Sequence, residues 1–177
     1  MRIEIDDKAF DMMLEYEQIK KRIRLLAIQL NVDYENRHPV FIGVLNGSFI
    51  FLADLIKEID IPLEISFVKL SSYKGDKRSL KIKEEIGLQM SLKDRDVIIV
   101  EDIVDSGHTL EYLLNLIKKE DPASVNVCTL LLKPKSVKTK FDEIAYIGFE
   151  VPDDFVVGYG LDYNGLGRNL RDIYKAV

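Results

Sequence analysis

The chain is poor in the residues that mark disulfide-bonded, zinc-binding or disordered proteins. Among its 177 residues there is one cysteine, no tryptophan, two histidines, ten glycines and five prolines. Cys128 cannot form an internal disulfide, and its apolar neighbours in V-N-V-C-T-L-L-L predict a buried small hydrophobic residue. The scarcity of His and Cys leaves an ordinary zinc site unsupported. With 47% hydrophobic and 31% charged residues, the composition is typical of a packed globular domain.

The chain also lacks an excess of positive charge and any long apolar run. It has 25 Lys and Arg against 30 Asp and Glu, a net charge of −5, so a generally basic surface for nucleic acid is absent. No apolar run reaches the roughly 18 residues that a transmembrane helix needs, and the start M-R-I-E-I-D-D-K does not resemble a secretory signal. We therefore expect one cytoplasmic domain, residues 1–177, with no nucleic-acid or membrane partner.

Hydrophobic periodicity predicts helices and strands in alternation. Apolar residues three and four apart predict an amphipathic helix over residues 10–30. Residues 71–82, rich in Lys and Arg and poor in apolar residues, are expected to form a long exposed loop. The alternation predicts an α/β fold with a mostly parallel central sheet flanked by helices. Further predicted helices cover residues 49–59 and 110–119, and predicted strands cover 40–45, 64–70, 96–100, 125–132, 144–151 and 155–158.

The most informative segment is V-I-I-V-E-D-I-V-D-S-G-H-T-L, residues 97–110. A buried strand is followed by the adjacent carboxylates Glu101 and Asp102, then by Asp105, then by a Gly-containing turn that opens a helix. Ligands of open parallel sheets bind at the carboxyl ends of the strands. Backbone N–H groups at such a helix start, together with Ser and Thr hydroxyls, form a phosphate cradle. We therefore expect residues 106–109 to bind a phosphate.

The carboxylates oppose that expectation, because at about 6 Å each would repel one phosphate charge by about 3 kcal/mol. Either a divalent cation or ligand hydroxyl groups would resolve the conflict, and a ribose 5-phosphate suits both halves of the segment. The alternative is a solvated acidic turn at a strand end. Neither a P-loop G-x-x-x-x-G-K-[ST] nor a strand-following G-x-G-x-x-G is present. His108 is interpreted as a turn residue that accompanies the phosphate cradle.

Two motifs carry a resemblance to a known family. V-E-D-I-V-D-S-G-H-T resembles the phosphoribosyl pyrophosphate signature of the type I phosphoribosyltransferases, and residues 148–164, G-F-E-V-P-D-D-F-V-V-G-Y-G-L-D-Y-N, resemble the purine end of its hypoxanthine branch. The resemblance runs from about residue 40 to 171. It implies the type I fold, with a core over about 35–145 and a small hood from about 1–15 and 146–177.

The resemblance also implies an activity. We expect transfer of the 5-phosphoribosyl group from phosphoribosyl pyrophosphate to hypoxanthine, and also to guanine, giving IMP or GMP and pyrophosphate with Mg²⁺ as cofactor. Members of the family are usually homodimers or homotetramers. The rival hypothesis is a nucleotide-sensing RNA-binding regulator that retains the fold, and the net charge of −5 argues against it.

The roles that the resemblance implies are as follows. Asp105 is the acid/base group at the purine imidazole nitrogen. Glu101 and Asp102 bind the ribose hydroxyls and, with Asp162, the metal. The 5-phosphate binds to Ser106, Gly107, His108 and Thr109, and the purine binds to Lys133, Phe155, Val156 and Asp162. Pyrophosphate binds to Asn46, Gly47 and Arg168. Ser72 and Tyr73 belong to a mobile loop that closes over the site.

Three of these assignments have alternatives. Lys133 could be a surface lysine before Pro134, and Phe155 could be an ordinary core aromatic. Asn46 stands where many relatives have Lys, so the side-chain charge is missing there, whereas backbone donation to pyrophosphate survives the change.

Overall fold

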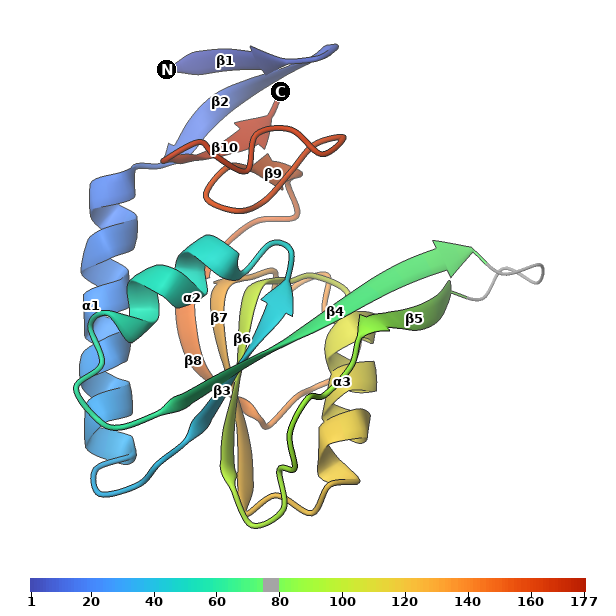
Figure 1. Ribbon diagram of the computed structural model, residues 1–177. Helices are drawn as coiled ribbons and strands as arrows, with labels where there is room; N and C mark the ends of the chain where they lie inside the picture. The colour runs from blue at the N-terminus through green and yellow to red at the C-terminus, as the bar shows by residue number, and fades with distance from the viewer. Residues whose placement is uncertain (75–79) are drawn as a thin grey trace.

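The structure is a computed structural model that describes residues 1–74 and 80–177, and of residues 72–74, 80 and 81 it describes the backbone alone. A six-stranded sheet, in the order β5-β4-β3-β6-β7-β8, forms its centre (Figure 1). All neighbouring strands in it are parallel except β4 and β5. The strands are β3 Val40–Leu45, β4 Glu64–Lys74, β5 Leu80–Ile86, β6 Asp96–Val104, β7 Ser124–Leu132 and β8 Ile144–Glu150.

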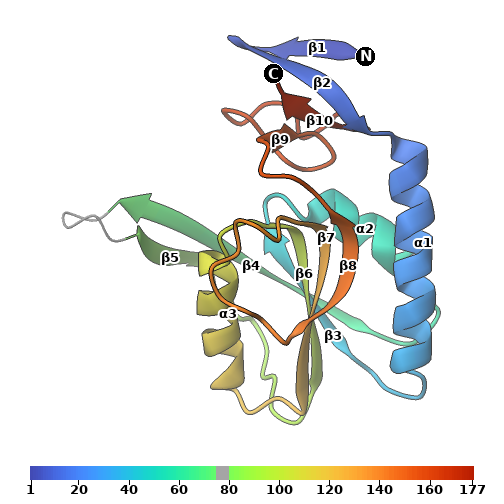
Figure 2. The ribbon, with the colours of Figure 1, turned by 180° about the vertical axis from the view of Figure 1, so that it is seen from behind.

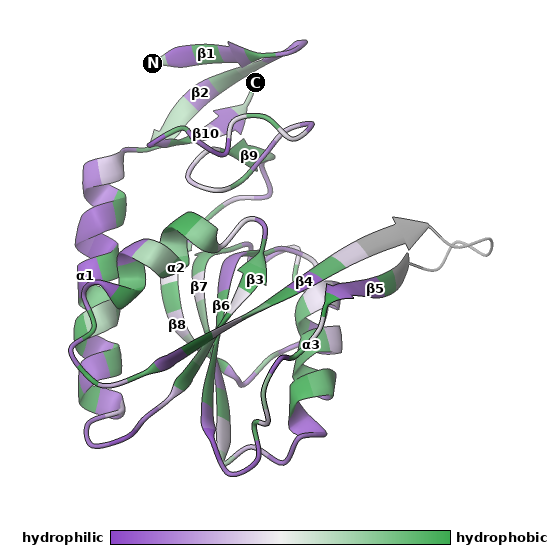
Figure 3. Cartoon of the chain, viewed as in Figure 1, coloured by the Kyte–Doolittle hydropathy of each residue, from purple (hydrophilic) through white to green (hydrophobic). Residues whose placement is uncertain are grey.

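Helices cover both faces of this sheet. Helices α1 (Tyr16–Asp33) and α2 (Phe49–Ile56) pack on one face, and α3 (His108–Lys118) packs on the other (Figures 1 and 2). Along β6, Ile98 and Val100 belong to the first core, and Val97 and Ile99 belong to the second. Burial on both faces explains why the parallel strands read as continuous apolar runs (Figure 3).

A smaller four-stranded sheet joins the two ends of the chain in the order β1-β2-β10-β9 (Figure 1). Its strands are β1 Arg2–Ile5, β2 Lys8–Leu14, β9 Val156–Val157 and β10 Ile173–Ala176. It has its own small core around Phe10, Val157 and Tyr174. We call this sheet, together with residues 151–172, the hood. Residues 144–150 are not part of it, because they form β8 and pair with β7 in the larger sheet.

The predicted helix over residues 10–30 is wrong at its start. Residues 8–14 form β2, which pairs with β1 and β10, and the helix begins only at Tyr16. A capping box marks the boundary. The Glu15 N–H donates to the Gln18 side chain at 2.9 Å, and the Glu15 side chain accepts from the Gln18 N–H. Phe10 lies in the hood core while Met13 and Leu14 pack against the main core. Over so few residues the apolar spacing fits helix and strand equally.

The predicted loop over residues 71–82 is also wrong where the structure describes it. Strands β4 and β5 form an antiparallel hairpin that pairs Ser72 with Ile82 and Tyr73 with Lys81. The hairpin extends away from the body of the sheet (Figure 2), which suits its polar composition. Residues 75–79 of that prediction lie outside the described residues. The predicted helix over 49–59 ends earlier, at Ile56.

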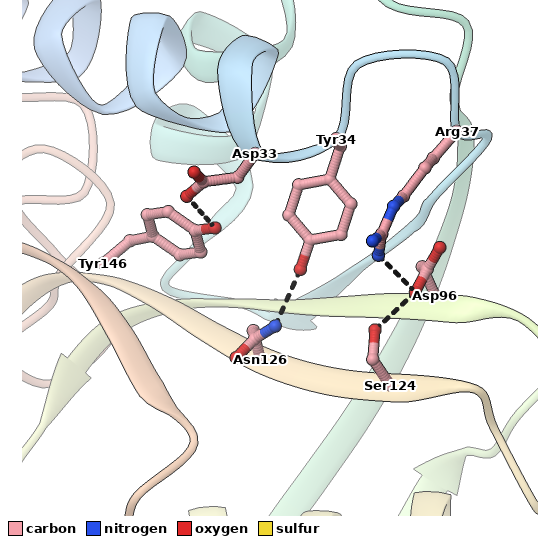
Figure 4. Close-up of polar contacts among 7 residues, drawn as sticks. All are labelled: Asp33, Tyr34, Arg37, Asp96, Ser124, Asn126 and Tyr146. Atoms are coloured by element: carbon pink, nitrogen blue, oxygen red, sulfur yellow. Dashed lines mark hydrogen bonds and ion pairs between the residues drawn. The ribbon is translucent and has the colours of Figure 1, made fainter.

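Polar side chains tie α1 to the sheet at the edge opposite the hood. Buried tyrosines at the end of α1 and in β8 take part in this network (Figure 4), and each strand from β6 to β8 contributes a side chain. The contacts are Tyr146 to Asp33 at 2.7 Å, Asn126 to Tyr34 at 2.8 Å, and Arg37 and Ser124 to Asp96 at 3.2 and 2.6 Å. Within the part of the chain that is described, no helix has the length and apolar character of a membrane span.

Candidate functional site

The acidic pair lies at the carboxyl end of the central strand β6. Glu101 is only 8% exposed, and its Oε2 has no hydrogen-bond partner among the described residues. Asp102 is partly buried and its Oδ1 accepts a bond from the Ile103 N–H at 2.9 Å. A buried carboxylate oxygen without a partner is costly, so Glu101 is prepared for a donor or cation supplied by a ligand.

Burial also changes the acidity of this pair. It raises the pKa of Glu101 well above its usual range, and the neighbouring Asp102 raises it further. Burial raises the pKa of Asp102 to about 6, against lowering by the Ile103 N–H and by Arg168. Two carboxyl groups held this close favour ligands that bring hydroxyl donors or positive charge.

The Gly-containing turn after Asp105 opens helix α3 as predicted. Gly107 has φ +86°, and a Cβ there would lie 2.6 Å from the ring of Phe141, so only glycine fits this backbone. A small cavity of about 90 Å³ lies between the turn and the strand end. Glu101, Ile103, Asp105, Ser106, Gly107 and Thr109 are among its lining residues. His108 is exposed, is absent from that lining, and is the first residue of α3 rather than part of the turn.

Lys133 is not a surface lysine. It is 6% exposed, and its Nζ lies 2.9 Å from Asp105 Oδ2 and 3.6 Å from Asp153 Oδ1. Parallel pairing of β6 with β7 sets Val104 beside Leu132, so the next residues of both strands emerge together. Asp153, which also accepts from the Ser136 hydroxyl at 2.7 Å, is a site residue that sequence reasoning missed although it lies inside the P-D-D-F motif.

The loop after β3 packs directly on the acidic pair. The Leu45–Asn46 peptide bond is cis. A Cβ on Gly47 would lie 1.5 Å from Asp102 Oδ2, so the loop backbone approaches the carboxylate more closely than any side chain permits. On its other side the loop meets the hood, since a Cβ on Gly160 would lie 2.1 Å from the Gly47 carbonyl oxygen. Three segments far apart in sequence therefore meet at Gly47.

The hood turn carries the predicted Asp162 and Arg168 together. Arg168 Nη2 lies 2.6 Å from Asp162 Oδ1, and its Nη1 donates to the Gly160 carbonyl at 2.7 Å. Both side chains influence the pKa of Asp102: Arg168 lowers it and Asp162 raises it. Within the described residues, no three or more His, Cys, Asp and Glu side chains are grouped to hold a metal. Glu101, Asp102 and Asp162 thus do not form a ready-made metal cage.

The aromatic predicted to stack on the base is half-exposed. Phe155 is 44% exposed and lies in the hood beside Tyr163, at 5.8 Å between ring centroids, with Lys8 Nζ 5.0 Å from its ring centre. The alternative of an ordinary core aromatic is therefore wrong. Val156 begins β9 and is buried. Ser72 and Tyr73 lie on the projecting β4–β5 hairpin, where they pair with Ile82 and Lys81.

Comparison with known proteins agrees with this geometry. The phosphoribosyl transferase domain family matches residues 10–164. The hypoxanthine-guanine phosphoribosyltransferase of Bacillus subtilis is 43% identical over 159 residues, 89% of this chain and 88% of that protein. The bifunctional protein TilS/HprT of Listeria innocua is 45% identical over 159 residues, and this chain spans 24% of its length. The crystal structure of a hypoxanthine-guanine phosphoribosyltransferase from Bacillus anthracis superposes with a TM-score of 0.89 at 38% identity, covering 94% of this chain and 98% of that one.

These findings confirm the resemblance read from the two motifs, and they confirm the α/β fold with a mostly parallel sheet. The rival hypothesis of an RNA-binding regulator gains no support from these relatives. The family match covers most of the chain, including the loop after β3, the acidic pair and Asp162. The chain therefore belongs to the phosphoribosyltransferase family.

Proposed function

We propose that this chain is a purine salvage enzyme that transfers the 5-phosphoribosyl group from phosphoribosyl pyrophosphate to hypoxanthine, and also to guanine. The products are IMP or GMP and pyrophosphate. The observation that carries the proposal is the buried Glu101 carboxylate, with an unpartnered oxygen, beside a phosphate-binding turn. Relatives at about this length are named hypoxanthine or hypoxanthine-guanine phosphoribosyltransferases.

The ribose phosphate spans the strand end. Residues 106–109 bind the 5-phosphate through backbone N–H groups and hydroxyls, while Glu101 and Asp102 accept bonds from the ribose hydroxyls. The cavity that contains Glu101 also contains Ser106, Gly107 and Thr109, which supports one ligand reaching both. Next to Asp102, the backbone of Asn46 and Gly47 binds pyrophosphate, helped by Arg168 from the hood.

The purine lies between the core and the hood. The Nζ of Lys133 donates to the 6-oxo group, an oxygen that only accepts, and Asp105 takes the proton from the purine imidazole nitrogen. Phe155 stacks on the base, and the Val156 backbone reads its edge. In the reaction the bond from the anomeric carbon to pyrophosphate breaks, and the bond to the purine nitrogen forms. The proton lost by the base passes to Asp105.

Phosphoribosyltransferases are generally Mg²⁺-dependent, and the acidic residues here fit that cofactor. Magnesium is commonly held by one or two carboxylates together with waters and substrate oxygens, so a preformed cage is not needed. We propose that Asp162, with Glu101 and Asp102 through the ribose hydroxyls, holds Mg²⁺ bound to the substrate. When bound, the metal neutralises charge on the pyrophosphate leaving group.

We further propose that the β4–β5 hairpin, with Ser72 and Tyr73, closes over the reacting atoms. Departure of pyrophosphate leaves an oxocarbenium-like sugar, and water would capture it in an open site. The location of the hairpin at the carboxyl end of β4, next to β3, supports this role. The enzyme is proposed to act in the cytoplasm.

We also propose a homodimer or homotetramer. Side chains of Phe49 on α2 and of Ile65 and Phe67 on β4 are 44%, 42% and 39% exposed, and the ring of Phe67 faces Gly43 next to Leu52 of α2. Exposed apolar side chains on neighbouring elements mark an interaction surface. Light scattering on the purified protein tests this; a monomer at every concentration would contradict it.

A spectroscopic assay tests the activity. Hypoxanthine, guanine, xanthine and adenine are each supplied with phosphoribosyl pyrophosphate and Mg²⁺, and we expect turnover with hypoxanthine and guanine. Turnover with none of the bases would overturn the proposal. Tight, salt-resistant RNA binding in the same preparation would instead favour the regulator.

A further inference from the structure

A buried hydrogen bond joins the hood to helix α2. Tyr159 is 1% exposed, and its hydroxyl donates to Asp54 Oδ2 at 2.6 Å, although the two residues are 105 positions apart. Lys57 Nζ lies 2.6 Å from the other oxygen, Asp54 Oδ1, and holds that carboxylate in place. The bond from a neutral hydroxyl to a carboxylate is of the strong, charge-assisted kind.

On the core side, helix α2 connects Asp54 to the loop after β3. Helix α2 starts directly behind that loop, and the Leu52 N–H donates to the Ser48 carbonyl at 2.8 Å. The Ser48 hydroxyl is buried and donates to the Val44 carbonyl at 2.7 Å, so the loop is fastened at both ends. Asp54 lies farther along the same short helix, and a restraint on it therefore restrains the loop.

On the hood side, backbone hydrogen bonds connect the Tyr159 segment to Arg168. The Tyr159 N–H donates to the Leu170 carbonyl at 2.8 Å, and the next residue, Gly160, exchanges bonds with the Arg168 backbone and side chain at 2.9 and 2.7 Å. Gly160 is also the residue that packs on the Gly47 carbonyl. The aromatic ring of Tyr16, at the start of α1, lies 6.2 Å from the Tyr159 ring and completes the burial.

We propose that Tyr159 and Asp54 are positioning residues that lock the hood turn to α2 and so set the separation of the two pyrophosphate-binding parts, the Asn46–Gly47 backbone and Arg168. Neither residue contacts substrate. The inference rests on the function proposed above, and it assigns to this pair the geometry of pyrophosphate capture. It predicts that loss of this hydrogen bond changes the affinity for phosphoribosyl pyrophosphate separately from the affinity for the purine.

The test compares two tyrosines in the same chemical setting. Tyr159→Phe removes the bond to Asp54, and Tyr146→Phe removes the equivalent bond to Asp33 at the opposite edge of the sheet (Figure 4). Both variants lose one buried hydrogen bond and are expected to have similarly lowered Tm. Only Tyr159→Phe should raise the KM for phosphoribosyl pyrophosphate, by about five- to tenfold, with the KM for hypoxanthine within about twofold of the original.

Variants of the acceptor provide a second arm that leaves Tyr159 intact. Asp54→Asn keeps an oxygen that can accept from the tyrosine and should retain most of the affinity, whereas Asp54→Leu should behave like Tyr159→Phe. Isothermal titration calorimetry with Mg²⁺ and inorganic pyrophosphate measures binding without catalysis, and the variants should rank in the same order of affinity.

An unchanged KM for phosphoribosyl pyrophosphate in both Tyr159→Phe and Asp54→Leu would overturn the inference, and so would an equal rise in Tyr146→Phe. These outcomes are distinct from failure of the proposed function, which would appear as absence of turnover by the unaltered enzyme.

Discussion

Lys133 Nζ and Asp105 Oδ2 form an ion pair of 2.9 Å across the ends of β6 and β7. The residue proposed to donate to the purine 6-oxo group thus holds the residue proposed to take the purine proton. A 6-oxopurine presents an acceptor oxygen and an imidazole N–H on neighbouring positions, so one base can engage both members of the pair. Asp153, at 3.6 Å from Lys133, remains as its partner when the base binds.

We expect Asp105→Asn to lower kcat by more than about tenfold, because the amide cannot take a proton. The fold should persist, since Asp105 is half-exposed and Lys133 keeps Asp153. The control is Asp142→Asn, which removes an exposed carboxylate that pairs with Lys140. If kcat of Asp105→Asn stays within about threefold, a barrier change below about 0.7 kcal/mol, the acid/base role is wrong.

Replacing Lys133 by Met should weaken the binding of hypoxanthine more than the binding of phosphoribosyl pyrophosphate. Loss of a charged donor to the 6-oxo group corresponds to about 1.5–3 kcal/mol, a rise of about tenfold or more in the KM for the base. Lys135→Met is the control, because that lysine is only two residues away in sequence but is exposed. Equal effects of the two variants on the KM for hypoxanthine would refute the assignment.

Gly47→Ala should abolish most activity while the protein stays folded. The added Cβ would lie 1.5 Å from Asp102 Oδ2, so the carboxylate must leave its position. Misplacement of a substrate-binding group by about 1 Å can reduce the rate by about a hundredfold. Gly87→Ala is the control, because a Cβ there meets only the end of the Glu84 side chain, at 3.1 Å. Steady-state kinetics and Tm on both variants decide; an active Gly47→Ala enzyme would contradict the close contact.

The acidic pair should destabilise the free enzyme at neutral pH. In the unfolded chain Asp102 loses its proton near its usual pKa of about 4, and in the folded protein burial raises that pKa to about 6. Between these values the folded state binds more protons, so stability is lost as pH rises through this window.

Asp102→Asn removes this ionisation and should also remove activity. We expect its Tm to exceed that of the original protein by a margin that grows from about pH 4 to about pH 6 and then levels off. Thermal unfolding of both proteins across that range measures the margin. A margin that does not change with pH would show that Asp102 titrates normally.

Phe155→Leu should weaken purine binding by about 1 kcal/mol, a rise of about fivefold in the KM for hypoxanthine, through loss of aromatic stacking. Phe149→Leu, which changes a partly buried aromatic of β8 beneath Arg22, is the control. If the two substitutions act alike, the half-exposed ring of Phe155 is not the stacking surface.

Local sequence determined much of this protein by itself. Continuous apolar runs identified the buried strands, because parallel strands bury both faces. The E-D-I-V-D-S-G-H-T segment identified the acidic strand end and the glycine turn, since the residue types and their order along the chain are local information. Residues 8–14 escaped this reasoning because their role as a strand depends on pairing with the other end of the chain.

Tertiary structure alone decided which residues meet. Lys133 is paired with Asp105 because the parallel register sets Val104 beside Leu132, and no local pattern encodes a register between strands 28 residues apart. The contact of Gly47 with Asp102 depends on the pairing of β3 with β6 in the sheet, and the bond from Tyr159 to Asp54 depends on how the hood packs onto the core. Residue types and turns follow from short-range chemistry, whereas the distances that make them a site follow from long-range packing.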